Sequence, residues 1–231
     1  MKLKFKKVVI SILCVICLIC LFGCHNQKLF DMALNNVAEV RELMFCGSNK
    51  NIKATLISGF REEDYVVNGY CADPMEFGVL TFEVLADVSF LENVNYVLTI
   101  GSVRFDGKLE HNPYNDTYVC DIQKRITPGQ NIFAKIIAGD FVENVELFTV
   151  TNNWVLDYKA ALKTACIELD DELNEFVKDE QFCGECYIKI LNDDELDGTY
   201  YWFVNFVSRF GKNYAVVVDP ITAEILAKKT M

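Results

Sequence analysis

The sequence predicts an α+β protein in which an N-terminal helix and an antiparallel β-sandwich are followed by a helix packed on a small antiparallel sheet. Hydrophobic residues recur with a period of two from Ile52 to Val150, which is typical of strands, and with a helical period after residue 153. The length of 231 residues fits one or two folded domains. The predicted organisation is a leader at 1–23, a tether and amphipathic helix at 24–50, the β-sandwich at 51–152 and a last domain at 153–231.

The leader has the order of regions of a secretory signal. Residues 2–7 are rich in lysine and precede the apolar stretch Val8–Gly23, which is shorter than the ~20 apolar residues that span a bilayer. The residues Leu21, Gly23 and Cys24 resemble the lipobox of bacterial lipoproteins. The resemblance implies that Cys24 carries lipid and holds the protein at the cell membrane. In the alternative, an uncleaved signal anchor, the body of the protein also faces outside the cytoplasm.

The charge of the chain argues against one class of partner. It carries 33 acidic and 22 basic residues, and four of the basic residues lie in the leader. So acidic a surface repels phosphate backbones, and we therefore expect no nucleic-acid binding.

The first elements after the leader are a helix and a series of strands. Apolar residues at steps of three and four predict an amphipathic helix over 28–45, with Gly47 as its C-terminal cap. The alternating runs that follow are bounded by Gly, Asn and Asp. They predict strands at 52–58, 65–70, 80–86, 96–105, 117–123, 131–138 and 143–151.

One short segment of this β-region has a counterpart in a known family. Tyr118, two residues before Cys120, resembles the tyrosine corner of immunoglobulin-type domains, in which the tyrosine hydroxyl bonds back to the chain. The resemblance implies an immunoglobulin-like sandwich. No tryptophan lies between Cys71 and Cys120, which departs from that family's pattern.

The last domain is predicted as a helix over 158–176 followed by strands at 186–191, 199–207 and 213–218. The helix with Ala160 and Ala161, then strands ending in Asp219 and a turn before Ile225, resembles the PepSY domain. The resemblance implies an extracytoplasmic module that regulates or binds partners and brings no catalytic residues. Ala223 stands where that family has glycine, so this turn either needs no positive φ or is distorted.

Two cysteines, Cys183 and Cys186, stand at a spacing that suits a disulfide, a redox pair or two metal ligands. They follow a helix rather than begin one, and acidic neighbours favour the protonated thiols, so a structural role is the first expectation. A membrane-tethered thiol–disulfide oxidoreductase using this pair is the alternative function. A metal site is not expected, because a second closely spaced pair is missing. Six cysteines follow Cys24, and the sequence leaves their pairing open: Cys46, Cys71, Cys120, Cys166, Cys183 and Cys186.

No set of catalytic residues is evident, and we expect neither an enzyme nor a cofactor. His111 stands in a loop without an evident partner, and the acidic turn at 193–198 fits a solvated hairpin better than a calcium loop.

The strand 200–207 is apolar on both faces, and a helix covers only one of them. Tyr200, Trp202 and Phe206 are the residues we assign to partner binding, with packing between the domains as the alternative. The sequence thus predicts a membrane-anchored, non-catalytic binding or regulatory module, with a peptidase or envelope protein as its partner.

Overall fold

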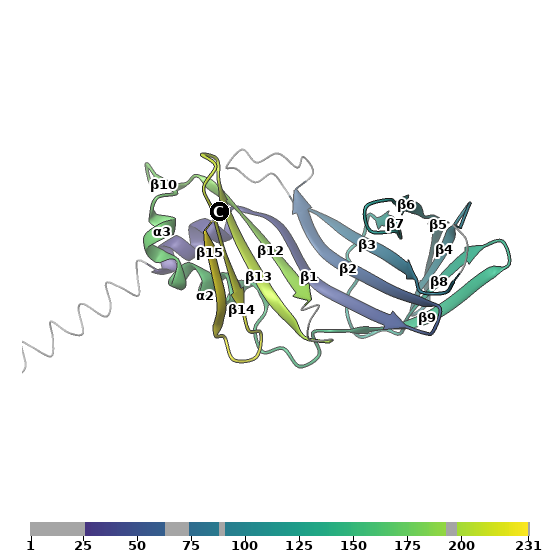
Figure 1. The fold of residues 1–231 in the computed structure, drawn as a ribbon. Coiled ribbons are helices and arrows are strands. Elements are labelled where there is room, and N and C mark those ends of the chain that lie inside the picture. The colour runs from purple at the N-terminus through teal and green to yellow at the C-terminus, as the bar shows by residue number, and fades with distance from the viewer. Residues whose placement is uncertain (1–25, 63–73, 88–90, 193–197, 231) are drawn as a thin grey trace, which may run out of the picture.

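The computed structural model describes residues 26–62, 74–87, 91–192 and 198–230 (Figure 1). Strands hold 56% of the described residues and helices 13%, so the predicted β-rich class with few helices is confirmed. The leader with Cys24, the predicted strand at 65–70, Cys71 and most of the acidic turn at 193–198 lie outside the described residues.

A short helix at residues 26–34 opens the described chain. The strands of the first part are β1 Val37–Ser48, β2 Ile52–Glu62, β3 Pro74–Val84, β4 Asn95–Ile100, β5 Val103–Lys108, β6 Glu110–Asn112, β7 Thr117–Ile122, β8 Ile132–Ala138 and β9 Phe141–Thr149. The second part has helices α2 Tyr158–Glu168 and α3 Asp170–Asn174, then strands β10 Val177–Lys178, β11 Gln181–Phe182, β12 Gly184–Asn192, β13 Tyr200–Ser208, β14 Asn213–Val218 and β15 Ile225–Thr230.

Strand β1 joins the two parts into one sheet. The order along this sheet is β15-β14-β13-β12-β1-β2-β3-β7-β6, with β1 parallel to β12 and antiparallel to β2. Strand β9 also pairs with β1 and continues the sheet through β8, β4 and β5. The first part therefore takes the form of a large, nearly closed sheet, with β4, β5, β8 and β9 facing β2 and β3 (Figure 1).

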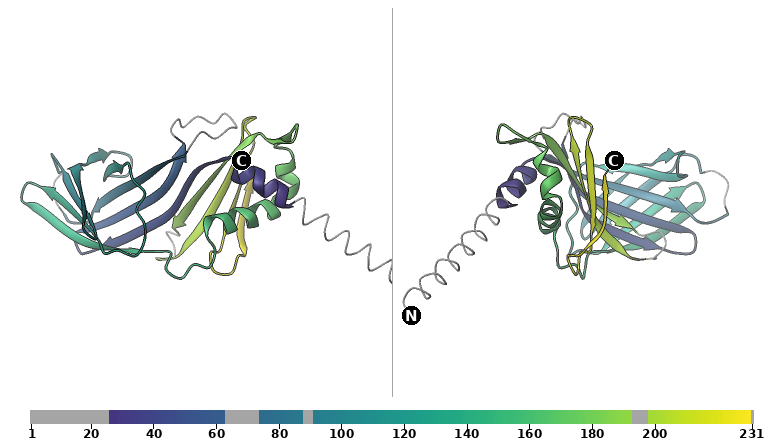
Figure 2. Two further views of the ribbon diagram at one scale, coloured as in Figure 1. Left: turned by 180° about the vertical axis from the view of Figure 1, so that it is seen from behind. Right: turned by 60° about the vertical axis from the view of Figure 1, so that its left-hand side comes forward.

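Two hydrophobic cores lie at the two ends of this sheet. The first fills the nearly closed part and is mostly aliphatic, with fully buried Leu56, Leu80, Leu98, Ile132 and Ile136. The second lies between β12–β14 and the helices, which cover one face of these strands (Figure 2). Aromatic residues dominate its large members, which include Phe176, Phe182, Trp202, Phe206 and Tyr214.

The predicted helix over 28–45 is wrong beyond residue 34, because β1 begins at Val37. The register of β1 shifts twice, between Val37 and Glu39 and between Val40 and Leu43. Such β-bulges interrupt the period of two, and here they produce apolar steps of three and four that imitate a helix. Gly47 is a strand residue and not a cap: a Cβ there would lie 2.1 Å from the backbone oxygen of Glu146.

Other predicted boundaries change as well. The helix over 158–176 is divided, because α2 ends at Glu168 and α3 follows after Leu169. The strand at 96–105 is the hairpin of β4 and β5, which turns at Gly101 with φ of 56°. A further strand, β15, follows the turn after β14.

Candidate functional site

The structure separates the aromatic residues that we assigned to partner binding. Trp202 and Phe206 are 2% and 0% exposed and belong to the core beneath the helices, so these two assignments are wrong as a binding surface. The Trp202 Nε1–H donates to the Leu156 carbonyl oxygen at 3.0 Å. Tyr200 is half-buried, and its hydroxyl donates to Cys46 Sγ at 3.7 Å.

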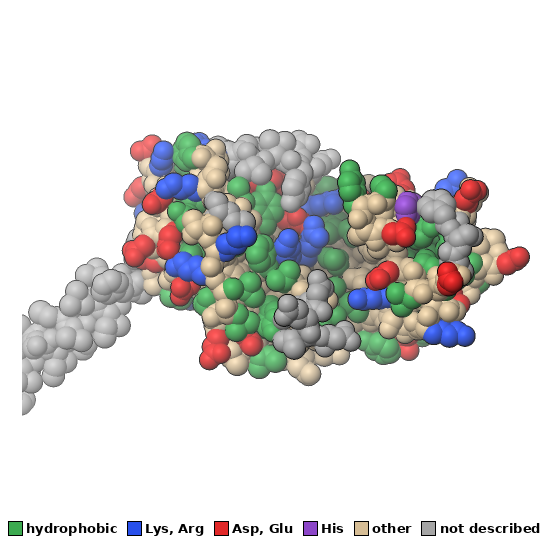
Figure 3. Space-filling model, viewed as in Figure 1, with side chains coloured by type: hydrophobic (Ala, Val, Ile, Leu, Met, Phe, Trp, Pro, Cys, Tyr) green, Lys and Arg blue, Asp and Glu red, His purple; other side chains and the backbone are tan. Residues whose placement is uncertain are grey.

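The opposite face of the same strands is left open by the helices. Side chains alternate along β13, so Phe203, Asn205 and Val207 point away from the buried Trp202. Figure 3 shows basic and hydrophobic side chains side by side over the middle strands of this face. Most of the acidic side chains seen in that view lie toward the two ends of the molecule.

A groove of about 240 Å³ lies on this open face, where β1, β12 and β13 run side by side. Two adjacent cross-strand rows form its floor and walls. The first row is Glu39, Tyr187 and Asn205, and the second is Arg41, Lys189 and Phe203. The groove therefore combines two aromatic rings, two cations, a carboxylate and an amide within a few side chains, with Val207 beside them.

The contacts inside the groove hold its charged groups in place. Glu39 is 6% exposed and accepts a hydrogen bond from Arg41 Nε. The ammonium of Lys189 lies 5.0 Å from the centroid of the Phe203 ring, within the range of a cation–π interaction. At the end of the groove the Tyr187 hydroxyl donates to Glu185 Oε2 at 2.7 Å, and Glu185 is 0% exposed.

Cys183 and Cys186 are not joined by a disulfide. Both side chains are thiols in the structure and both are buried. Cys183 Sγ donates to the Gln181 carbonyl oxygen, whereas Cys186 Sγ donates to that of Ala33 at 3.4 Å. Residues three apart on an extended chain point to opposite faces and lie ~10 Å apart, too far for a disulfide. Nothing in this arrangement supports dithiol chemistry.

Two further cysteines behave as core residues. Burial raises the pKa of the Cys166 thiol to about 12, with the charge of Asp170 as a smaller cause. Burial likewise raises the pKa of Cys120 to about 11. A raised pKa keeps a thiol protonated at neutral pH, so neither residue is a ready nucleophile.

A second hollow, of about 260 Å³, lies where the two parts of the molecule meet. Trp154 and Trp202 meet edge to face there, with ring centroids 4.9 Å apart. Both carboxylates at its rim are engaged, Glu42 with Arg125 and Asp157 as the N-cap of α2. We therefore interpret this hollow as a packing seam.

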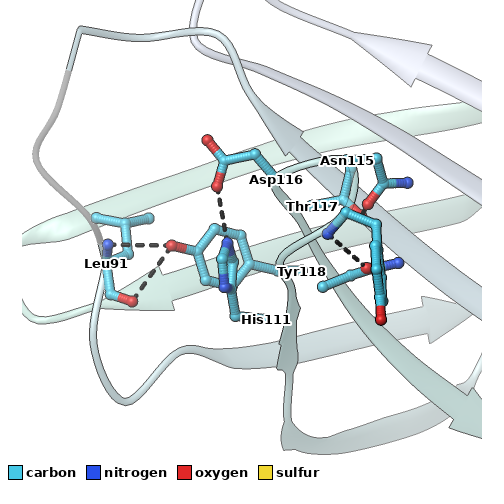
Figure 4. Close-up of polar contacts among 8 residues, drawn as sticks. Leu91, His111, Asn115, Asp116, Thr117 and Tyr118 are labelled. Carbon is cyan, nitrogen blue, oxygen red and sulfur yellow. Dashed lines mark hydrogen bonds and ion pairs between the residues drawn. The ribbon is translucent and has the colours of Figure 1, made fainter.

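His111 has a partner that the sequence did not reveal. Its Nε2 lies 2.7 Å from Asp116 Oδ1, across the turn between β6 and β7, and its ring packs on Tyr118 (Figure 4). The Tyr118 hydroxyl donates to the Leu91 carbonyl oxygen at 3.3 Å and accepts from the Leu91 N–H at 3.0 Å. The predicted bond from this tyrosine back to the chain is present, and its partner lies 27 residues upstream. The cluster fastens a turn and a loop together.

Three comparisons with known proteins were negative. A scan against protein-family models, a search of curated proteins and a search of solved structures each found no match to this chain. In the part of the chain that the structure describes, no helix is long and apolar enough to cross a membrane. Within the same residues no three His, Cys, Asp or Glu side chains gather as a metal site.

The sequence missed the groove because it placed Glu39 and Arg41 on a helix. The signal that identifies them is local: within Val37–Arg41 the two charged residues alternate with apolar ones. That alternation is typical of a strand with one polar face. The sequence did place Phe203 and Asn205 on a strand. It assigned partner binding to the opposite face of that strand, which the helices cover.

Proposed function

We propose that this protein is a non-catalytic binding or regulatory module, anchored by lipid on Cys24 to the outer side of the cell membrane. The single observation that carries the binding role is the groove on the open face of β1, β12 and β13. Helices close the other face of these strands, so among the described residues the groove side is the face of β12 and β13 that a partner can reach. A protein such as a peptidase or another envelope protein is the proposed partner.

Sequence features support the rest of the proposal. The basic and apolar leader ending at Cys24 is the basis for the lipid anchor and for the location. The order of α2, β12, β13 and β14 is the order expected of a PepSY-like domain. A glycine-like turn conformation at Ala223, with φ of 65°, also fits the glycine of that family at this position. This positive φ at Ala223 corrects the expectation that the turn needs none.

Site-specific photocrosslinking in intact cells tests the binding role. We replace Phe203, in the groove, with a photoreactive phenylalanine analogue and compare it with the same change at Phe148, which is 62% exposed on β9. The expected result is one abundant crosslinked protein from position 203 and none from position 148. The same set of products from both positions would contradict a binding role for the groove.

Cell fractionation tests the anchor separately. Exchange of Cys24 for serine removes the proposed lipid attachment point. We expect the protein to leave the membrane fraction and to lose incorporation of a labelled fatty acid. Retention of the label in the variant would show that Cys24 is not the lipidated residue.

A further inference from the structure

The groove contains a pair of like charges. Arg41 and Lys189 are direct partners across the parallel pairing of β1 and β12. Like charges directly opposite on neighbouring strands destabilise a sheet. The chain as a whole has a formal charge of −11, so adjacent cations on an otherwise acidic protein call for an explanation.

Neighbouring carboxylates compensate this pair only in part. Glu39 contacts Arg41 through Nε, which leaves the terminal guanidinium nitrogens with further donors. No carboxylate among the described residues lies within ion-pair distance of Lys189, whose ammonium rests over the Phe203 ring instead. An anionic group bound between the two cations therefore relieves their repulsion and gains charge-assisted hydrogen bonds.

The remaining walls of the groove indicate what the anion is attached to. Phe203 and Val207 provide apolar contact, and the Asn205 amide lies beside them. The volume of about 240 Å³ falls below the ~300–1,000 Å³ of pockets that enclose small-molecule ligands. A groove of this size, open on one side, suits one or two side chains of a larger partner.

We propose that the groove binds an acidic segment of a partner protein, in which a carboxylate lies between Arg41 and Lys189 while a neighbouring apolar side chain packs on Phe203. This inference rests on the proposed binding function and names the chemistry of its partner. Charge complementarity carries it, since the cations line the groove of a protein that is acidic overall.

A displayed library of random heptapeptides, selected on the full-length protein in detergent, tests the chemistry directly. We expect enrichment of peptides with aspartate or glutamate next to a large apolar residue, and affinity that falls as sodium chloride is added. Exchange of Lys189 or Arg41 for glutamine should weaken these peptides at least ~10-fold. Lys53→Gln is the matched control, because Lys53 lies on an exposed position of β2.

The outcomes separate this inference from the binding role itself. Enriched peptides without an excess of acid, or equal affinity in Lys189→Gln and Lys53→Gln, would overturn the acidic segment. Displacement by inorganic phosphate as effective as displacement by an acidic peptide would also overturn it, in favour of a simple anion site. In each of these cases a protein crosslinked from position 203 would leave the proposed function intact. Absence of any crosslinked protein from position 203 would instead contradict the proposed binding function.

Discussion

The two cores of this protein lie on one face of the same sheet but are closed in different ways. Leu56 and Phe60 lie on the same face of β2. Their partners on β1 are Phe45, which belongs to the first core, and Val40, which belongs to the second. In the first core the sheet curls and covers itself with β4, β8 and β9. In the second core helices cover the strands, and the reverse face stays open with the groove. The comparison indicates that one face of a continuous sheet can be closed either by the sheet itself or by helices, and that in the helix-covered part the reverse face carries the groove.

The largest expected effect comes from the aromatic side chain at the centre of the second core. Trp202→Ala removes a residue that is 2% exposed, and large-to-small changes of this kind cost about 3–5 kcal/mol. Phe203→Ala, one residue along β13 on the open face, should cost about 1 kcal/mol, mainly the contact with Lys189. Urea unfolding followed by circular dichroism measures both. Equal losses would contradict the assignment of one closed and one open face.

The next effect concerns the first core alone. A Cβ on Gly47 would lie 2.1 Å from the Glu146 backbone oxygen, so Gly47→Ala should push β9 away from β1 and cost about 1–3 kcal/mol. Hydrogen exchange should accelerate in β9 and remain unchanged in β13. Gly107→Ala is the control, because its Cβ would meet the movable Tyr96 ring at 3.1 Å. If β13 amides also lose protection, the two cores open together through the shared strand β1.

Particular residues show how far the sequence could predict this arrangement. Strands such as β4 and β8 followed from alternation, because buried residues alternate along them with exposed or half-buried ones. Strand β1 was harder to recognise, because its two register shifts give apolar steps of three and four that outweigh the short alternation within Val37–Arg41. The residues of the groove come from β1, β12 and β13, which meet through a parallel pairing of segments far apart in the chain. No local pattern encodes that meeting.

Alkaline pH should weaken both cores through their thiols. Burial raises the pKa of Cys166 from 9.0 to about 12, so above pH 9 the thiol ionises in the unfolded chain while it stays protonated in the folded one. Below pH 9 the thiol is protonated in both states and does not lower the free energy of unfolding. Between pH 9 and 12 ionisation in the unfolded chain lowers that free energy by about 1.4 kcal/mol per pH unit. Urea unfolding between pH 8 and pH 11 should show a shallower decline in Cys166→Ala. An unchanged slope would mean that Cys166 is accessible to solvent.

Cys120 offers the corresponding measurement in the first core. Its pKa is raised to about 11, again mainly by burial, and the Tyr96 hydroxyl beside it has a pKa raised to about 12. Cys120→Ala should therefore also reduce the alkaline loss of stability, and by less than Cys166→Ala. The reverse order would show that the first core excludes solvent from its thiol more completely.

The smallest expected effect lies in the turns. Two hairpins of the first part turn at left-handed glycines, Gly101 and Gly139, with φ of 56° and 59°, whereas Asp116 adopts φ of 52° between β6 and β7. In the second part Ala223 adopts φ of 65° between β14 and β15. The turn is held by Asp219, whose Oδ1 accepts the N–H groups of Ile221 and Thr222 at 2.7 and 2.9 Å. These bonds also lower the pKa of Asp219.

Ala223→Gly should therefore stabilise the protein by about 0.5–1 kcal/mol. Glycine relieves the strain of a left-handed alanine, about 1–2 kcal/mol, but it also raises the conformational entropy of the unfolded chain, which offsets part of this gain. Gly139→Ala is the reciprocal change and should destabilise by a similar amount, since nothing lies within 4 Å of the added Cβ and only the backbone conformation opposes it. Thermal unfolding of the two variants measures both signs. A loss of stability in Ala223→Gly would show that the Ala223 methyl group makes a favourable contact, and that the strain at this turn is smaller than its φ indicates.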